Sequence, residues 1–534
     1  MQKTIYYGGD ILTLRDGPLY EEAVLTEGGV IRALGSRESL CAGHPDARLC
    51  NLHGAALMPS FIDSHSHLTA LAGTMGLANL DGVEGFEDIV GRIVDFKEKR
   101  GLSDTDWIIC FGYDHNMLVE KAHPTRRTLD IEGLLNPVMI SHRSGHMGVL
   151  NTAALQALGI TAQTPDPKGG RIGREADGRT PNGYLEETAF TNLSTKIPQP
   201  GLTQQLNQLD AAQQVYLSYG ITTVQDGLTK KEPWEMLKAA SVKGRLLLDT
   251  VCYPDLEQYQ DIAQEPEYQE YRGHLRIGGY KIFLDGSPQG RTAWLSEPYE
   301  NAPDGYRGYP VHPDEAVRTF VNIALRENRQ LLAHCNGDAA AQQLLDAFQA
   351  AKDEGKDPRK IRPVMIHAQT VRYDQLDRMA ALGILASFFV SHVHYWGDVH
   401  LQNLGMARAG RISPARTAGE KGVVYTFHQD APVIPPNMMD TVWCAVNRTT
   451  RSGLVLGDGE RVTTLQALKA VTGNAAYQYF EEERKGTIEP GKLADFVVLD
   501  RNPLQTDPKE LREIKVLKTI KEGRILFERK EDLL

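Results

Sequence analysis

The sequence predicts an α/β protein: a (β/α)8 TIM barrel joined to a small β-sandwich domain that both chain termini form together. Eight β-prone runs occur along the middle of the chain. Most of them are followed by a helical stretch, which is the pattern of a (β/α)8 barrel. Short β-prone runs broken by turns also occur at both ends of the chain. With 534 residues, of which 41% are hydrophobic, the chain can fill a large core.

The two ends, residues 1–55 and 484–534, are predicted to pair into one composite domain because neither has enough strands for a stable sheet alone. Two independent flaps are the alternative, and they would leave more sheet edges exposed. Gly8-Gly9 predicts a turn between the first two runs. The β-prone runs are Thr4–Tyr7, Ile11–Leu14, Ala23–Thr26, Val30–Leu34, Asp495–Leu499, Val516–Ile520 and Arg524–Phe527.

The barrel is predicted over residues 56–483. Its strand-like runs are Ala56–Ile62, Gly220–Gln225, Leu246–Cys252, Ile277–Leu284, Leu331–His334, Pro363–His367, Leu385–Val390 and Val423–Phe427. The predicted helices include Ala339–Ala351, Tyr373–Leu382 and Thr464–Thr472. A long gap follows the first run, so we expect an insertion at about 70–215 that covers one barrel face. Within it, Trp107–Phe111 and Val138–His142 are strand-like.

Composition and charge exclude several classes of function. Lys and Arg number 58 and Asp and Glu 69, and a net charge of −11 disfavours a nucleic-acid partner. No window of roughly 18 consecutive apolar residues predicts a membrane span. The N-terminus lacks a signal-peptide pattern, and six scattered cysteines suggest reduced thiols. We therefore expect a cytoplasmic protein with a small-molecule substrate and no membrane partner; a homodimer is also considered.

The most informative motif closes the first strand-like run, in the segment FIDSHSH. His65 and His67 are two residues apart, so their side chains lie on the same side of an extended chain. Two imidazoles placed in this way can share a Zn²⁺-type ion, at the barrel end where active sites lie. A surface turn with two histidines is the alternative.

Three further ligand-type residues strengthen the metal interpretation. His334 ends the fifth run, His367 ends the sixth, and Asp430 follows the eighth. Histidines and a carboxylate are rarely gathered at one barrel mouth for packing alone. The sequence therefore predicts a metal centre at the carboxyl ends of the strands.

The chain resembles the amidohydrolase superfamily over nearly its whole length. The segments PSFIDSHSH and GTIEPGKLADFVVLD carry this resemblance. The segments KIFLDGS and HCNGDA make it most similar to the N-substituted formamide deformylase (YtcJ-like) branch. In that branch the lysine that matches Lys281 can be N-carboxylated and bridge two metals. A lysine paired with an acidic residue is the alternative.

The resemblance implies a metal-dependent hydrolase of carbon–nitrogen bonds other than peptide bonds, acting on a linear amide or N-formyl compound. It implies one or two divalent ions, with Zn²⁺ expected. His65, His67 and Asp430 would hold one ion, and His334 and His367 the second, with Lys281 as the bridge. A metal-bound hydroxide would attack the carbonyl, with Asp430 as general base and then acid. The alternative that Asp430 serves only as a metal ligand stays open.

Other residues are weaker candidates for substrate binding. The branch has a similar histidine near His146, for which a structural role is about equally expected. His394 and Trp396 follow the seventh run and would line the pocket or form an aromatic lid. Asp285 and Arg291 belong to the branch motif, and we favour a buried ion pair or loop brace over substrate contact.

Two rival functions remain open at this stage. A hydrolytic deaminase of a heterocycle would typically use one metal and a glutamate shortly after the fifth-strand histidine, and no glutamate follows His334 in CNGDAAAQQ. A non-catalytic regulatory protein on the same fold would be expected to lack a ligand, and none is missing. The number of metal ions per chain distinguishes the deaminase from the amidase, with one ion expected for the first and two for the second. Hydrolytic activity of the metal-loaded protein distinguishes the amidase from the regulatory protein.

Overall fold

The computed structural model describes residues 2–115, 117–142, 146–193, 196–197 and 200–530. The chain divides into two compact units. Residues 1–71 and 210–534 make up the main unit, and residues 72–209 make up the inserted unit. No helix among the described residues is long and apolar enough to cross a membrane.

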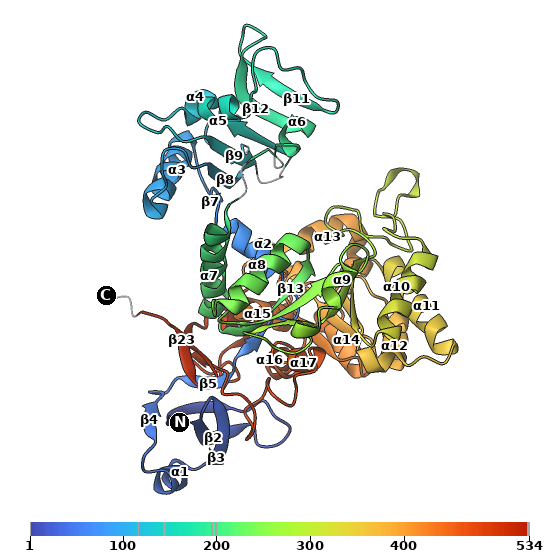
Figure 1. Cartoon of the computed structure of the whole chain (residues 1–534). Helices are drawn as coiled ribbons and strands as arrows, with labels where there is room; N and C mark the ends of the chain where they lie inside the picture. The colour runs from blue at the N-terminus through green and yellow to red at the C-terminus, as the bar shows by residue number, and fades with distance from the viewer. Residues whose placement is uncertain (1, 116, 143–145, 194–195, 198–199, 531–534) are drawn as a thin grey trace. The chain divides into compact units, whose positions relative to one another are not determined.

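Strands from both chain ends form one mixed sheet in the main unit, as predicted. Its strands run in the order β23-β22-β21-β5-β1-β2-β3, and β4 pairs with β1. The join is the antiparallel pairing of β5 with β21, for example Leu57 opposite Val498. Figure 1 shows the blue N-terminal strands beside the red C-terminal ones. The strands are β1 (Lys3–Leu12), β2 (Tyr20–Glu27), β3 (Val30–Gly35), β4 (Arg48–Asn51), β5 (Ala56–Pro59), β21 (Phe496–Leu499), β22 (Val516–Lys521) and β23 (Arg524–Glu528). A short helix, α1 (Arg37–Gly43), follows β3.

Two local predictions for this region are wrong. The runs on either side of Gly8-Gly9 form a single strand, β1, whose register shifts between Tyr7 and Ile11. The glycines allow a bulge instead of a turn, because Gly8 has φ of 77° and a Cβ at Gly9 would lie 2.1 Å from a backbone oxygen. The run Ala56–Ile62 is also two strands, since β5 belongs to the terminal sheet and β6 pairs with β13.

The rest of the main unit is built on parallel strands. They form two parallel sheets, β6-β13-β14-β15 and β16-β17-β18-β19-β20. A parallel bridge between Asp255 and Lys281 joins the two sheets. At the other end, the Ser64 hydroxyl donates to the Phe427 carbonyl at 3.1 Å and so connects β6 with β20. The strands are β6 (Phe61–Ile62), β13 (Ile221–Thr229), β14 (Asp249–Pro254), β15 (Leu275–Ile277), β16 (Gly279–Phe283), β17 (Gln330–Cys335), β18 (Val364–His367), β19 (Leu385–Phe388) and β20 (Tyr425–Phe427).

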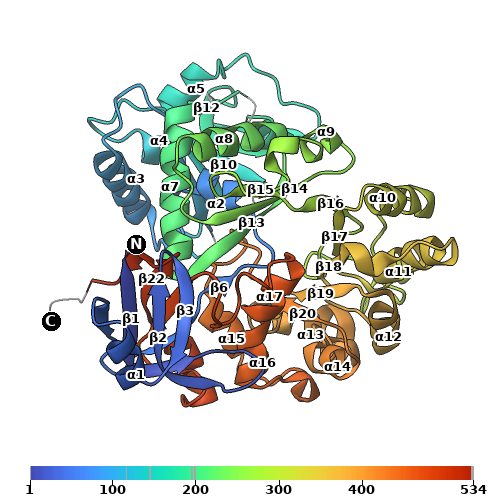
Figure 2. The same cartoon turned by 60° about the horizontal axis from the view of Figure 1, so that its bottom comes forward.

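Helices alternate with these strands, which confirms the α/β class. In Figure 2, α10, α11 and α12 line the outside of strands β16–β19. The three helices named from the sequence correspond to α11, α12 and α16. The helices are α8 (Lys231–Val242), α9 (Gln260–Ala263), α10 (Asp314–Arg326), α11 (Asp338–Asp353), α12 (Tyr373–Leu382), α13 (His392–Ala409), α14 (Ala415–Glu420), α15 (Met438–Asn447), α16 (Thr464–Ala470) and α17 (Gly473–Gln478).

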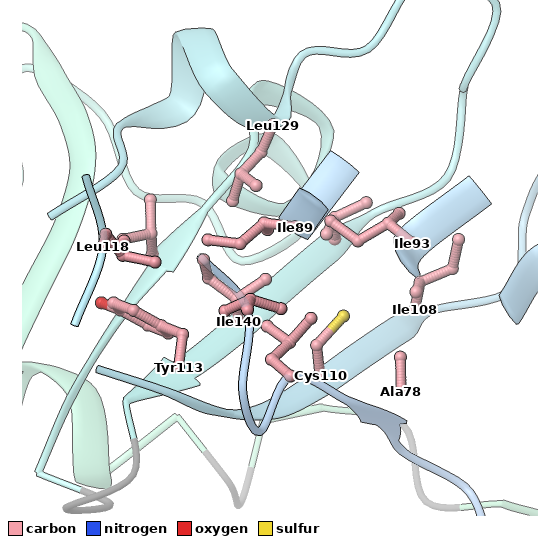
Figure 3. Packing of buried hydrophobic residues seen from close by; sticks show 13 residues of the cluster. Ala78, Ile89, Ile93, Ile108, Cys110, Tyr113, Leu118, Leu129 and Ile140 are labelled. Carbon is pink, nitrogen blue, oxygen red and sulfur yellow. The ribbon is translucent and has the colours of Figure 1, made fainter. Parts of the chain in front are cut away.

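The inserted unit has a sheet and a core of its own. Its strands run in the order β11-β12-β10-β9-β8-β7. Figure 3 shows Ile89 and Ile93 of α3 directed toward Ile140 of β9, in a cluster of fully buried apolar side chains. The strands are β7 (Ala78–Asn79), β8 (Ile108–Tyr113), β9 (Val138–His142), β10 (Met147–Leu150), β11 (Gly170–Arg174) and β12 (Pro181–Glu187). The helices are α3 (Phe86–Arg100), α4 (Arg126–Leu129), α5 (Thr152–Ala157) and α6 (Thr188–Thr191); α2 (Leu68–Thr74) and α7 (Leu202–Ser218) flank the unit in sequence.

Candidate metal centre

Six ligand-type side chains predicted from the sequence come from five strands of the main unit. Parallel strands bring their carboxyl ends to one edge, so residues that end different strands can meet there. Two lie inside a strand, one of them a single residue before its end, and the others end or closely follow one. They are His65, His67, Lys281, His334, His367 and Asp430.

The first group joins His65 and His67 to Asp430. The Asp430 Oδ1 atom lies 3.3 Å from His65 Nε2 and 3.2 Å from His67 Nε2. Donors bound to one ion at about 2.0–2.2 Å with tetrahedral angles would be about 3.3–3.6 Å apart. Asp430 Oδ1 is buried, yet it accepts no hydrogen bond from any residue that the structure describes. A divalent cation would satisfy this buried oxygen.

The second group is a pair of histidines beside the first. His334 Nδ1 lies 3.1 Å from His367 Nε2, and His367 Nε2 lies 3.9 Å from Asp430 Oδ2. The other ring nitrogen of His334 is 3.2 Å from the Gly286 carbonyl, to which it can donate. Such a bond leaves Nδ1 as the unprotonated atom, which is the form that binds a metal.

Lys281 lies against the first group and is fully buried. Its Nζ atom is 3.4 Å from His65 Nε2. Among the described residues, no carboxylate oxygen lies within 4.0 Å of Nζ, so the alternative of a lysine paired with an acidic residue finds no support. Burial lowers the pKa of Lys281 to about 7, which favours a neutral amine.

Burial also sets the protonation of the other groups. Desolvation, followed by the charge of Lys281, lowers the pKa of His65 to about 4 and that of His334 to about 3. Burial alone would raise the pKa of Asp430, but the adjacent His65 and His67 rings hold it well below its ordinary value. At neutral pH His65 and His334 are therefore neutral imidazoles and Asp430 is an ionised carboxylate, which are the forms that bind a metal.

The backbone at the centre is strained. His367 has φ of 70°, Ala368 of 45° and Asp430 of 56°, which is the left-handed region that residues other than glycine rarely adopt. Such conformations persist where the surrounding structure imposes them, and they are concentrated at functional sites. Here they occur at two proposed ligands.

Gln225 is a supporting residue that the sequence did not reveal. His65 Nδ1 lies 2.6 Å from Gln225 Oε1 and can donate to it, which leaves Nε2 free for a metal. The Gln225 amide donates in turn to the Ser64 carbonyl at 3.0 Å and to the Tyr479 hydroxyl at 3.1 Å. Gln225 thus fixes both the tautomer and the ring orientation of His65.

Replacing Gln225 with leucine should weaken metal binding by about 10–100-fold, because His65 then loses the acceptor that orients it. Competition of the purified protein with a chromophoric chelator measures this affinity. Gln225→Glu keeps an acceptor at the same place and serves as the matched control, with affinity near that of the unaltered protein. Equal affinity in all three proteins would contradict the assigned role of Gln225.

His428 is a second supporting residue. Its Nε2 lies 3.1 Å from His367 Nδ1, and its Nδ1 lies 2.8 Å from the Ser387 hydroxyl. The chain Ser387–His428–His367 therefore orients His367 from the side away from His334. The sequence places His428 two residues before Asp430 but does not show which atoms it contacts.

Of the two roles favoured for Asp285 and Arg291, a buried ion pair or a loop brace, the structure shows no ion pair between them among the described residues. Asp285 accepts hydrogen bonds from the backbone N–H groups of Asn336, Gly337 and Trp294 at 2.7–3.0 Å. Asp285 thus braces the loop after His334. Arg291 Nε instead donates to Asn403 Oδ1 at 2.8 Å.

The remaining substrate-binding candidates occupy different places. Trp396 packs against Phe389 with ring centroids 5.8 Å apart, and Phe389 lies 6.2 Å from the His367 ring, so Trp396 connects to the centre through one aromatic side chain. His394 Nδ1 is 2.9 Å from the Thr449 carbonyl. His146 belongs to the inserted unit, where its Nδ1 lies 3.2 Å from Glu187 Oε2.

This set of histidines and an aspartate at strand ends agrees with comparisons to known proteins. Residues 48–527 match the model of the amidohydrolase family. The chain belongs to this family. It is 29% identical to the putative amidohydrolase YtcJ of Bacillus subtilis, over 99% of this chain and 100% of that protein.

Two further comparisons support the family assignment. The N-substituted formamide deformylase of Arthrobacter pascens is 29% identical, over 95% of each chain. The crystal structure of an uncharacterized metal-dependent hydrolase from Pyrococcus furiosus is 26% identical, with a TM-score of 0.77, over 94% of this chain and 100% of that one. The fold is therefore that of the TIM-barrel amidohydrolases, and the chain is an enzyme, a metal-dependent amidohydrolase.

Proposed function

We propose that this amidohydrolase hydrolyses carbon–nitrogen bonds other than peptide bonds in a small molecule, either a linear amide or an N-formyl compound. The single observation that carries the proposal is the buried Asp430 Oδ1, which lies 3.2–3.3 Å from two histidine nitrogens without accepting a hydrogen bond from the described residues. The similarity to an N-substituted formamide deformylase supports the choice of substrate class.

We further propose the finer details of the centre. Two ions of the Zn²⁺ type would be held, one by His65, His67 and Asp430 and the other by His334 and His367, with an N-carboxylated Lys281 between them. The parallel strands would close into a (β/α)8 barrel, and the terminal sheet would fold into a small β-sandwich. Imidazole and carboxylate ligands suit Zn²⁺, and they also accept Mn²⁺, Fe²⁺ and Co²⁺.

The residues of the centre have distinct chemical tasks. A bound divalent ion supplies Lewis acidity, which lowers the pKa of water and polarises a carbonyl oxygen. Asp430 is ionised, so its carboxylate can take a proton from the attacking water and deliver it to the departing nitrogen. The His65 and His67 rings hold that carboxylate in place. Side chains of His67 and Asp430 remain 24% and 14% exposed, so a substrate can reach them.

The apolar side of the centre favours a substrate with a hydrophobic group. The Phe283 ring lies 4.8 Å from the His334 ring, and Phe389 lies 5.3 Å from His428. Beside a bound substrate these rings would limit the access of water to the reacting bond, which would strengthen the electrostatic interactions there. Trp396, packed on Phe389, would extend this apolar wall.

The test measures hydrolysis by the metal-stripped and metal-reloaded enzyme across linear amides, N-substituted formamides, cyclic imides and amino-substituted heterocycles. We expect activity on amides or formamides only after reloading, with amine release equal to acid release. Ammonia release from the heterocycles alone would replace the proposal with a deaminase. A reloaded protein that is inactive on the whole panel would support the regulatory alternative.

A further inference from the structure

The inserted unit contains a second group of metal-ligand side chains. Strands β8 and β9 are parallel neighbours, and Tyr113 near the end of β8 is opposite His142 at the end of β9. Asp114 and His115 follow β8 directly. The carboxyl ends of two parallel strands therefore bring Asp114, His115 and His142 together, as they bring the ligands together in the main unit.

The donor atoms of this group converge. His142 Nε2 lies 3.4 Å from Asp114 Oδ1 and 3.4 Å from His115 Nδ1. Asp114 Oδ1 and His115 Nδ1 are 3.9 Å apart. Ligands at about 2.0–2.2 Å from one ion with near-tetrahedral angles are about 3.3–3.6 Å apart. Two of the three separations already have this value, and the third exceeds it by a few tenths of an ångström.

A surrounding set of rings holds the group in shape. The His123 ring stacks on His115 with centroids 3.9 Å apart and an interplanar angle of 27°. A 3.1 Å hydrogen bond joins His123 Nδ1 to the Tyr113 hydroxyl. The ring of His115 is thereby fixed by packing, which resembles the way outer residues orient metal-binding histidines.

We propose that Asp114, His115 and His142 form a second divalent-metal site of the Zn²⁺ type, distinct from the hydrolase centre of the main unit. Three protein ligands leave a fourth tetrahedral position open. The side chains of His115 and Asp114 are 28% and 20% exposed, so this position is accessible to water or to a small anionic ligand. The ion would tie the ends of β8 and β9 together.

A comparable group elsewhere is less suited to a metal. Asp249, His274 and Glu522 also offer atoms within 4.8 Å of one another. However, Asp249 Oδ2 already lies 2.5 Å from the Lys485 ammonium and 2.8 Å from that of Lys521. Two buried cations thus occupy the place of a metal.

The experiment uses the full-length chain, stripped of metal and reloaded with Zn²⁺, with metal content measured per chain. His115→Asn/His142→Asn should bind one ion fewer than the unaltered protein. His65→Asn/His334→Asn, which damages the hydrolase centre, should still bind one ion. His53→Asn replaces an exposed histidine of the main unit and is the control with unchanged content.

A second measurement protects the test against misfolding of the double variant. Co²⁺ added to His65→Asn/His334→Asn should give the visible absorption of a His/Asp-coordinated ion. This absorption should disappear when the milder Asp114→Asn change is added, while the circular dichroism spectrum stays the same. Two results would overturn the second site. One is equal metal content in the unaltered protein and in His115→Asn/His142→Asn. The other is the absence of Co²⁺ absorption from His65→Asn/His334→Asn.

Discussion

Replacing Asp430 with asparagine should lower kcat by about 10³-fold, which is within the range for loss of a general acid–base group. Asparagine has nearly the same shape but cannot take a proton from water or deliver one to the leaving nitrogen. It also removes the anionic oxygen that lies 3.2–3.3 Å from His65 and His67. Steady-state kinetics of the metal-loaded variant, on the best substrate of the panel, measure the effect.

The same variant distinguishes the two roles left open for Asp430. If Asp430 is a general base and acid, the variant keeps most of its metal and loses kcat; if it is a ligand alone, activity falls only in proportion to lost metal. Asp398→Asn is the control. Asp398 lies on helix α13, accepts a hydrogen bond from the Ser452 hydroxyl at 2.6 Å and has no part in the centre. A kcat within tenfold of the unaltered enzyme would refute the assignment.

The grouping of the proposed ligands at one edge of the strands could be predicted, because the histidines that end strands have a local signature. A hydrophobic run that ends in His334 or His367 shows both the strand and the position of its end. Parallel strands then place these ends together without further information. The pairing of the two terminal segments was predictable for a similar reason, since each end has too few strands alone.

The supporting residues could not be predicted, because their roles depend on contacts between distant segments. Gln225 lies in a buried strand whose sequence pattern is that of any core strand, and its role arises from a 2.6 Å approach to His65, 160 residues away. For Asp285 the sequence leaves a buried ion pair and a loop brace open, and the structure shows a brace of three backbone hydrogen bonds. Buried carboxylates need such partners, but the sequence does not say which.

Prediction from the sequence fails for a different reason at the boundary between the terminal sheet and the parallel strands. The run Ala56–Ile62 is continuous in hydrophobicity, so periodicity predicts one strand. The chain instead leaves the terminal sheet after Pro59 and pairs Phe61 with Ile221. Ser60 marks the change, with its hydroxyl 2.6 Å from that of Thr222. Hydrophobic patterns show that residues are buried but not which sheet they join.

Removing the side-chain amine of Lys281 should also abolish most of the activity, with kcat for Lys281→Met lower by about 10³-fold, or about 4 kcal/mol of transition-state stabilisation. The amine is fully buried, lies 3.4 Å from His65 Nε2 and has no carboxylate of the described residues within 4.0 Å. A buried unpaired ammonium is costly. Reaction of the neutral amine with CO₂ releases one proton and gives a carbamate, whose two oxygens can each bind an ion.

Carboxylation of Lys281 would make activity depend on CO₂ in a way that simple packing of a neutral lysine would not. Enzyme stripped of metal and reloaded in CO₂-depleted buffer should recover little activity until bicarbonate is added. Reloading with ¹³C-labelled bicarbonate should give a carbamate carbonyl NMR signal that is absent from Lys281→Met. Lys281→Arg keeps a positive charge but cannot form a stable carbamate. If a positive charge at this position suffices, the arginine variant stays active. If a carbamate bridge is required, the arginine variant is as inactive as the methionine variant. An active, metal-loaded enzyme with an unmodified Lys281 would exclude the bridge and, with it, the proposed two-ion centre.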